Sequence, residues 1–446
     1  MKRTIIVSLL IAVSLSAFAQ KGDVAKTGLN FGPLPAVGYS SDLGWHYGAL
    51  SDIYWYGDGS KYPEYVWKAN VEASWYSKGN SVYHTFFDSK YLVPGLRISA
   101  SVSYFGNKTT NFFGFNGARS LYVPELNVIT PDTFTPQGMG FYLMERNIFR
   151  VATCFQGKFG DSNWGWAGGL TYWNITTGHA RNKSLTDGTT SLYDIYVKND
   201  IIPEAEKAGG QHLELKAGVV YDTRDHENNP TKGTNLELYF FGSPDIISRH
   251  DNSYLKLAVH FKQFIPIVQD RLTFGAHVAY QGLVAGSAPF YMLQTIQSIN
   301  MKQINTEGLG STCTLRGTVV NRLQGNSYAW TNMELRWTFA KFYWIGQNWA
   351  LATNPFFDMG VVVKPYRLEQ MKSLAKDDTF IATVDGKSYR ASDFYTGSEE
   401  KLHMSAGAGL HVIMNQNFNV NFEFGKCFDK NDGTGLGINI GLNYIF

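Results

Sequence analysis

The most constraining feature of this sequence is an alternation of apolar and polar residues with a period of two. The last ten residues, GINIGLNYIF, place five apolar side chains on one face: Ile438, Ile440, Leu442, Tyr444 and Phe446. The preceding run, from Phe418 to Gly425, repeats the pattern and carries Glu423 on its polar face. Because successive side chains of a β-strand point to opposite faces, the pattern predicts strands with one apolar and one polar face.

The same alternation recurs throughout the chain. The clearer runs are 43–49, 96–104, 213–221, 236–240, 255–261, 272–280, 333–339, 402–410, 418–425 and 438–446, and the noisier ones are 62–77, 81–92, 112–130, 141–157, 163–177 and 348–363. They give about 16 strands, an even number that suits a single-chain transmembrane barrel. We therefore predict an all-β fold, a transmembrane antiparallel β-barrel spanning residues 34–446. Its first strand is expected near residues 37–50 and its last near 436–446.

Composition narrows the class of protein further. Aromatic residues make up 15% of the chain and charged residues only 17%, which is little charge for a set of soluble domains. No late apolar run approaches 18 residues, so a bundle of membrane helices is excluded. A formal net charge of +2 gives no overall electrostatic attraction for nucleic acid. Three cysteines do not build a disulfide framework. A soluble β-sandwich remains the alternative that alternation alone does not exclude.

The first residues predict the compartment. Lys2 and Arg3 precede an apolar run from Ile5 to Val13, and Ala17 and Ala19 give the small-x-small pattern of a cleavage site. We expect a signal peptide at residues 1–19, a short periplasmic segment at 20–33, and a barrel in the outer membrane of a Gram-negative-type bacterium. Long polar insertions at 107–140, 178–210, 286–325 and 362–401 are expected outside the cell, and the short turns at 266–270 and 414–417 in the periplasm.

Three segments carry a family resemblance. They are TLRGTVVNRLQGNSYAWTNMELRW with Arg316, Gly317, Arg322, Gly325, Glu334 and Arg336; NPFFDMGVV with Phe356, Asp358 and Gly360; and YDTRDHENNPTKG with Asp222, Arg224, Asp225, Pro230 and Gly233. They resemble, in that order, the sixth-loop signature, the Phe-x-Asp-x-Gly strand and the strand-turn-strand element of the BamA/TamA family of surface-antigen barrels. The resemblance implies that the long loop folds into the lumen.

Strand parity predicts an ion-pair site independently of that resemblance. If Met333, Leu335 and Trp337 face lipid, Glu334 faces the lumen, and the same count turns Phe356 and Asp358 inward. Two enclosed carboxylates need a cation, and the guanidinium of Arg316 can bridge both. The alternative is that Arg316 is an ordinary arginine of a surface loop.

The segment after Asp222 also resembles a calcium loop, but its spacing departs from the EF-hand and its composition suits a tight turn, which we favour. We expect no metal site and no cofactor. The chain shows no Gly-x-Ser-x-Gly elbow, His-Glu-x-x-His or P-loop motif, so we expect no enzymatic activity.

The resemblance implies a role in outer-membrane biogenesis, either protein insertion and translocation or lipid movement, through a weak lateral seam between the first and last strands. The expected seam residues are Gly38, Gly44, Gly48, Gly437, Gly441 and Phe446. The glycines among them would weaken the pairing of the two strands. Expected partners are outer-membrane lipids including lipopolysaccharide, β-barrel client proteins, a separate periplasmic subunit and a second copy in a homodimer, with no nucleic acid. Family members usually carry periplasmic POTRA domains, and residues 20–33 are too short for one, so we expect a POTRA-less member. The alternatives are a passive channel for small solutes and a structural barrel whose surface loops bind a partner.

Overall fold

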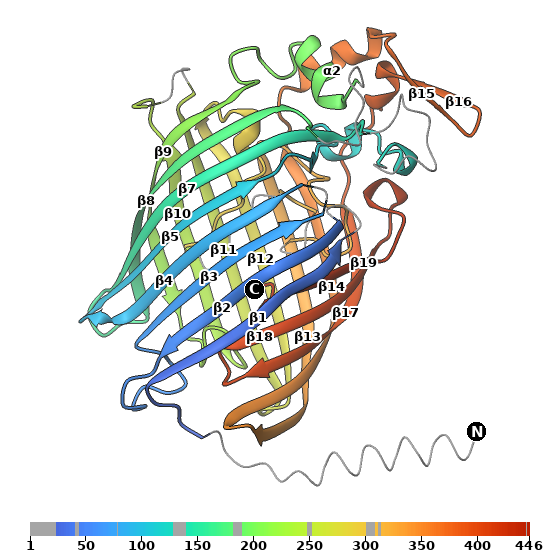
Figure 1. Cartoon of the computed structure of the whole chain (residues 1–446). Helices are drawn as coiled ribbons and strands as arrows, with labels where there is room; N and C mark the ends of the chain where they lie inside the picture. The colour runs from blue at the N-terminus through green and yellow to red at the C-terminus, as the bar shows by residue number, and fades with distance from the viewer. Residues whose placement is uncertain are drawn as a thin grey trace, which may run out of the picture.

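The protein is a single large antiparallel sheet that curls into a barrel (Figure 1). A computed structural model describes residues 24–40, 44–77, 79–127, 140–181, 190–247, 252–299, 308–310, 314–442 and 444–446. Each long strand of the described chain pairs with the next one along the sequence, and β1 approaches β19. The predicted all-β architecture with about 16 strands is confirmed.

Sixteen long strands form the wall. The first eight are β1 (Leu29–Ser40), β2 (Gly44–Trp55), β3 (Trp67–Tyr76), β4 (Ser81–Val93), β5 (Leu96–Gly106), β7 (Leu143–Lys158), β8 (Trp164–His179) and β9 (Gly209–Asp222). The other eight are β10 (Gly233–Ser243), β11 (Tyr254–Val268), β12 (Leu272–Gly286), β13 (Ser327–Trp344), β14 (Gln347–Lys364), β17 (His403–Met414), β18 (Phe418–Cys427) and β19 (Gly437–Leu442).

Shorter elements lie in the loops. They are β6 (Thr110–Asn111), η1 (Gly117–Arg119), η2 (Pro124–Leu126), α2 (Leu192–Lys198), η4 (Phe290–Met292), α3 (Leu368–Met371), η5 (Lys372–Lys376), the hairpin of β15 (Phe380–Val384) and β16 (Lys387–Arg390), η6 (Ala391–Phe394) and η7 (Lys430–Asp432). None of the helices in the described part of the chain is long and apolar enough to cross a membrane.

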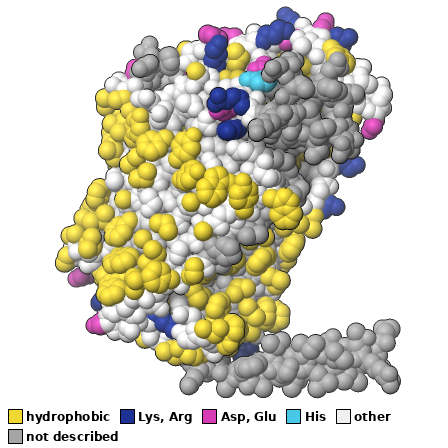
Figure 2. Space-filling view, viewed as in Figure 1, with side chains coloured by type: hydrophobic (Ala, Val, Ile, Leu, Met, Phe, Trp, Pro, Cys, Tyr) yellow, Lys and Arg dark blue, Asp and Glu magenta, His cyan; other side chains and the backbone are white. Residues whose placement is uncertain are grey.

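The two faces of the wall differ as the alternation predicts. Leu410 on β17 is 53% exposed, whereas its neighbour His411 is 1% exposed and faces the lumen. Hydrophobic side chains gather over the outer face of the barrel, and charged side chains lie mainly near its two ends (Figure 2). This distribution suits a wall that meets lipid outside and encloses polar groups inside.

The long loops pack together over one end of the barrel. Aromatic rings from separate loops meet there, such as Phe115 with Tyr366 at 4.8 Å between ring centres and Phe141 with Phe394 at 4.5 Å. Phe290 and Tyr196 belong to the same buried cluster. We call this cluster the dome, and it gives the loops a hydrophobic core of their own.

Two predicted strands are wrong in position, although the total number of strands is right. The stretch 112–127 is part of the dome and contains only the short turns η1 and η2, because its aromatic residues pack against other loops rather than against lipid. The strand expected near 37–50 is instead two strands, since residues 29–40 and 44–55 pair with each other as β1 and β2. β1 thus begins within the stretch expected to precede the barrel. The predicted signal peptide lies outside the described residues.

Candidate functional site

Arg316 lies at the centre of a buried ion-pair cluster in the lumen. Its Nε and Nη2 atoms donate 2.8 Å hydrogen bonds to the two carboxylate oxygens of Asp358 on β14. Its Nη1 donates to Glu334 Oε1 on β13 at 2.5 Å and to Glu423 Oε1 on β18 at 2.8 Å. The guanidinium also stacks on Phe356, 3.6 Å from the ring centre. The long loop therefore delivers one cation to carboxylates on three strands.

Glu423 is the member of this cluster that was not predicted as a site residue. It lies on the polar face of the run from Phe418 to Gly425, so the alternation already turned it inward. The sequence did not show the order of the strands. In the structure β17 pairs with both β14 and β18, and this order brings β18 near β14 and β13. The one signal for Glu423 in the sequence was that it is the only acidic residue on the inward face of this strand.

The tip of the loop presses its backbone against the seam strands. Gly317 has a φ of +86°, and a Cβ there would lie 2.4 Å from the carbonyl carbon of Gly425 on β18. A Cβ on Gly437 of β19 would lie 2.7 Å from the Cα of Gly317. Only glycine allows this conformation and this approach. The tip thus rests directly on the last two strands of the barrel.

The other residues of the loop motif fasten the tip to its surroundings. Arg322 donates hydrogen bonds to Ser120 O at 2.8 Å in the dome and to Asn431 O at 2.6 Å in the β18–β19 loop. A Cβ on Gly325 would clash with Val362 at 2.3 Å, and one on Gly360 would meet Leu315 at 3.1 Å. These contacts hold the loop between the dome and β14.

Arg336 extends the cluster to the end of the sequence. Its Nε donates to Glu334 Oε2 at 2.8 Å, and its Nη2 donates to the backbone oxygen of Phe446 at 2.9 Å. The guanidinium lies 3.9 Å from the ring centre of Tyr444, which is 6% exposed and stacks on His411. The prediction that Tyr444 and Phe446 share the lipid face of the last strand is therefore wrong. Strand β19 ends at Leu442, and cation–π contacts to Arg336 hold the following aromatic residues in the lumen.

The strand-turn motif lies at the end of the barrel that carries the short turns. Arg224 forms a two-pronged ion pair with Asp222 at 2.6 and 2.9 Å. The Asp225 carboxylate accepts hydrogen bonds from the Thr231 side chain and from the backbone of Thr231 and Lys232. Burial alone would raise the pKa of Asp225, but these hydrogen bonds hold it below its ordinary value. The carboxylate closes a tight turn, in which Pro230 lies between β9 and β10 and Gly233 begins β10 with a φ of +105°.

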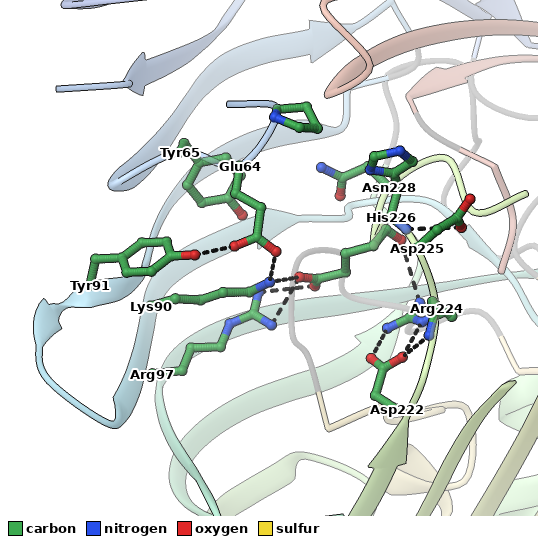
Figure 3. A network of polar contacts seen from close by, with 12 residues as sticks. Glu64, Tyr65, Lys90, Tyr91, Arg97, Asp222, Arg224, Asp225, His226 and Asn228 are labelled. Atoms are coloured by element: carbon green, nitrogen blue, oxygen red, sulfur yellow. Dashed lines mark hydrogen bonds and ion pairs between the residues drawn. The ribbon is translucent and has the colours of Figure 1, made fainter. Parts of the chain in front are cut away.

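Glu227, in the same turn, binds side chains of β4 and β5. Figure 3 shows those side chains, Lys90 and Arg97, together with the turn residues Arg224, Asp225 and Asn228. The Glu227 carboxylate binds Arg97 on β5 at 3.0 and 3.1 Å and Lys90 on β4 at 3.1 Å. The adjacent Asn228 donates a 2.8 Å hydrogen bond to Asn417 in the β17–β18 turn. The turn therefore bridges two separate parts of the rim, and the sequence did not single out this role for Glu227.

A further loop joins this network. Lys90 also pairs with Glu64 at 3.0 Å, and Tyr65 donates a 2.6 Å hydrogen bond to Asp88. We name the set comprising Glu64, Tyr65, Asp88, Lys90, Arg97, Glu227, Asn228 and Asn417 the turn-side clasp. Ahead of β1, the Val24 N–H also crosses this end to Asn348 at 3.0 Å. The clasp lies at the end of the barrel opposite the dome (Figure 1).

The edges of the sheet lie at β1 and β19. Among the described residues, β1 has a hydrogen-bonded ladder with β2, and β19 has one with β18, but no ladder joins β1 to β19. Gly38 on β1 and Gly437 and Gly441 on β19 lie on these edge strands. Gly44 and Gly48 do not, because both belong to β2, which is paired on both sides. Phe446 is likewise not on the edge, since it lies in the lumen beside Phe264 and His277.

These features define a class of protein: an outer-membrane β-barrel that holds a long loop in its lumen through a buried arginine. Within that class, the chain belongs to the Omp85 superfamily, because the Omp85 superfamily domain matches residues 67–446. No curated protein sequence matches the chain.

Solved structures with a similar fold include BamA from Haemophilus ducreyi lacking POTRA domains 1–3, with 15% identity and a TM-score of 0.49 over 94% of this chain and 69% of that one. CdiB from Escherichia coli has 9% identity and a TM-score of 0.49 over 95% of this chain, and CdiB from Acinetobacter baumannii has 10% and 0.43 over 94%. The chain spans 62% and 66% of the length of those two CdiB structures.

Family membership gives a coarse function. It indicates a protein of the Gram-negative outer membrane that serves protein insertion or translocation, and it points to a non-enzymatic barrel. Members of the family work with client proteins and accessory subunits. In the described part of the chain, no group of three or more His, Cys, Asp or Glu side chains is placed to hold a metal ion.

Proposed function

We propose that this chain acts in outer-membrane biogenesis by moving protein or lipid through the lateral seam between β1 and β19. The observation that supports the proposal is the missing ladder: within the described residues, the other neighbouring long strands are hydrogen bonded, and β1 and β19 are not. The last strand is also short, with six residues against ten in β18. Unpaired edges offer backbone groups to a client strand and disturb the bilayer beside them.

The loop tip is placed to influence this seam. Gly317 lies against Gly437 on β19, and Arg336 holds the residues that follow β19 inside the lumen. Glu334 links the two regions, because it binds both Arg316 and Arg336. A change in the ion-pair cluster around Arg316 would therefore affect the end of the chain through two contacts. One joins Gly317 to Gly437, and the other joins Arg336 to Phe446.

The partners we propose are outer-membrane lipids including lipopolysaccharide, β-barrel client proteins, a separate periplasmic subunit and a second copy of the chain. A cleaved signal peptide at residues 1–19 and a short periplasmic segment before the barrel complete the proposal. An edge strand that pairs with a client by β-strand addition suits the β-barrel client proteins among these partners.

A seam lock tests the proposal. Paired cysteines, one on β1 and one on β19, are screened for disulfide formation in the outer membrane, and Leu410→Cys with Phe422→Cys serves as control because these residues are register partners on β17 and β18. We expect the seam lock, but not the control, to impair outer-membrane assembly until a reductant is added. Folding of other barrels and lipid content of the outer leaflet distinguish the two cargoes. Normal assembly with the seam fully locked would rule out the gate.

A passive channel for small solutes is the second candidate, and the structure favours it less. The dome lies at one end of the barrel, and the contacts of the turn-side clasp cross the other end. High and steady conductance of the purified protein in planar bilayers would support a channel. A structural barrel with a binding role is the third candidate; its partner would meet the dome, from which the β15–β16 hairpin extends.

A further inference from the structure

The first limb of the long loop, residues 290–299, runs along the lumen wall formed by β7 and β9–β13. Its backbone carbonyls accept hydrogen bonds from wall side chains at successive positions. Arg146 binds Tyr291 O at 2.7 Å, Lys256 binds Met292 O at 3.1 Å, Tyr328 binds Leu293 O at 3.0 Å, Gln281 binds Thr295 O at 2.7 Å, Tyr239 and His260 bind Gln297 O, and Lys216 binds Ser298 O at 3.0 Å. The wall thus binds the main chain of this limb.

Backbone N–H groups of the same limb are bound by wall acceptors. Ile299 N donates to Glu237 Oε2 at 2.9 Å, and Gln297 N donates to Gln281 Oε1 at 2.9 Å. Gln281 therefore serves both a carbonyl and an N–H of the limb, as a strand partner would. These contacts depend on backbone groups that every polypeptide carries, apart from the N–H that proline lacks.

Polar side chains of the limb are bound unevenly: His212 contacts the Tyr291 hydroxyl and Glu214 accepts a hydrogen bond from the Gln297 amide, whereas two other side chains have no partner. The amide nitrogen and oxygen of Gln294 and the hydroxyl of Thr295 are buried and have no hydrogen-bond partner in the described part of the chain. A buried polar atom without a partner costs free energy, so a wall fitted to this one sequence would be expected to bind them. The wall thus binds the main chain at successive positions and leaves the side chains of Gln294 and Thr295 unpaired.

The wall cations add a second argument. Lys216 and Lys256 are 5% and 3% exposed, and neither forms an ion pair with a described residue. Both donate to backbone carbonyls of the limb. A buried ammonium with no carboxylate within ion-pair distance needs such acceptors, so both lysines would bind another carbonyl-rich chain if the limb left.

We propose that this wall is a binding track for extended polypeptide main chain, and that residues 290–299 occupy it as a displaceable stand-in for a client segment. The proposal deepens the protein-handling form of the proposed function and rests on it for its biological meaning. It does not require the seam to open, because the track lies on β7 and β9–β13, away from β1 and β19.

The test frees the limb without removing it. A specific protease site is inserted between residues 299 and 308 of the full chain, the folded protein is cut in detergent, and retained heat-modifiability shows that the barrel is intact. Fluorescein-labelled ten-residue peptides are then added, with the composition of residues 290–299 in native and in shuffled order. We expect both peptides to bind the cut protein with Kd values within about twofold of each other, and neither to bind the uncut protein.

Wall variants identify the groups that bind. Lys216→Met with Lys256→Met removes two charge-assisted donors, so both peptides should bind about tenfold or more weakly. Lys68→Met is the matched control, because this lumen lysine pairs with Asp52 at 2.7 Å on the opposite wall and does not contact the limb. Affinity should stay within about twofold of the unmodified value in this control.

A second readout covers the case in which the double variant does not fold. A photo-crosslinking phenylalanine analogue replaces Phe241, which belongs to the same buried cluster as Ile299. Crosslinks should map to residues 290–299 in the uncut protein and move to the added peptide after cutting. Binding of the native-order peptide alone, or crosslinks that stay on the limb at saturating peptide, would overturn the proposal and identify the limb as a permanent plug. Peptide binding is also measured in the seam-locked protein, because the track does not require the seam to open. The result therefore tests the track separately from the gate.

Discussion

Arg336 on β13 holds Phe446, the last residue of the sequence, inside the barrel. The guanidinium donates a 2.9 Å hydrogen bond to the backbone oxygen of Phe446 and lies 4.8 Å from the centre of its ring. The same side chain binds Glu334, which also binds Arg316 at the loop tip. The position of the segment after β19 and the position of the long loop are therefore coupled through one carboxylate.

Arg336→Ala should release the segment that follows β19. It removes the hydrogen bond to Phe446 and the cation–π contacts to Tyr444, and loss of one partner of a buried ion pair typically costs about 3 to 5 kcal/mol. Hydrogen–deuterium exchange of residues 437–446 should rise. Arg390→Ala, which removes an exposed arginine of the dome, is the control and should leave this exchange unchanged.

Arg316→Ala should loosen the whole long loop. The substitution leaves Asp358, Glu334 and Glu423 enclosed without their shared cation, so a loss of about 3 to 5 kcal/mol is expected. Heat resistance of the folded barrel on gels should fall, and residues 286–325 should become sensitive to protease. Arg316→Lys should restore little, because an ammonium cannot bind two carboxylate oxygens side by side. Unchanged heat-modifiability and protease resistance would contradict the role of Arg316.

Gly317→Ala should lift the loop tip from the seam strands. An added Cβ would lie 2.4 Å from the backbone of Gly425, and overpacking of this kind costs about 1 to 3 kcal/mol. Gly386→Ala is a matched control, because Gly386 has a similar φ of +79° but no atom within 4 Å of the added Cβ. The melting temperature should fall further in the Gly317 variant than in the control. Equal shifts would assign the effect to backbone strain alone.

Glu227→Gln should open the turn-side clasp. The neutral amide cannot compensate Arg97 and Lys90 as the carboxylate does, so the turn should detach from β4 and β5. We expect faster hydrogen–deuterium exchange in residues 223–232 and more frequent conductance events in planar bilayers. Glu204→Gln removes an exposed surface carboxylate paired with Lys207 and should change neither measurement.

Acid should weaken the β9–β10 turn through Asp225. Hydrogen bonds from Thr231 and Lys232 hold the pKa of this carboxyl below its ordinary value, so its contribution is fully present above the unfolded-state pKa of about 3.9. It is lost as the pH falls through the lower folded-state value. Protection of residues 223–232 against exchange should thus be constant from pH 7 to about pH 5 and decrease at lower pH. Asp225→Asn should abolish this pH dependence.

Much of the wall could be predicted from the sequence because strand alternation is local. The two-residue period turns Glu334, Asp358 and Phe356 inward wherever the strands lie. It also turned Glu423 inward, although only the order of strands around the barrel brings Glu423 to Arg316. The stretch 112–127 misled the prediction because aromatic residues with a rough alternation suit a dome core as well as a lipid-facing strand.

The sequence by itself determined the all-β class and the side on which the charged residues of the wall lie, since neighbouring residues set those features. The number of strands was right only because the false strand after residue 112 offset the strand missed at the start of the barrel. Only the tertiary structure decided what meets inside the barrel. Arg316 and Glu423 are 107 positions apart, Glu227 and Arg97 are 130 apart, and Arg336 and Phe446 are 110 apart. Such contacts follow from how the sheet curls and where each loop crosses it, and no local periodicity carries that information.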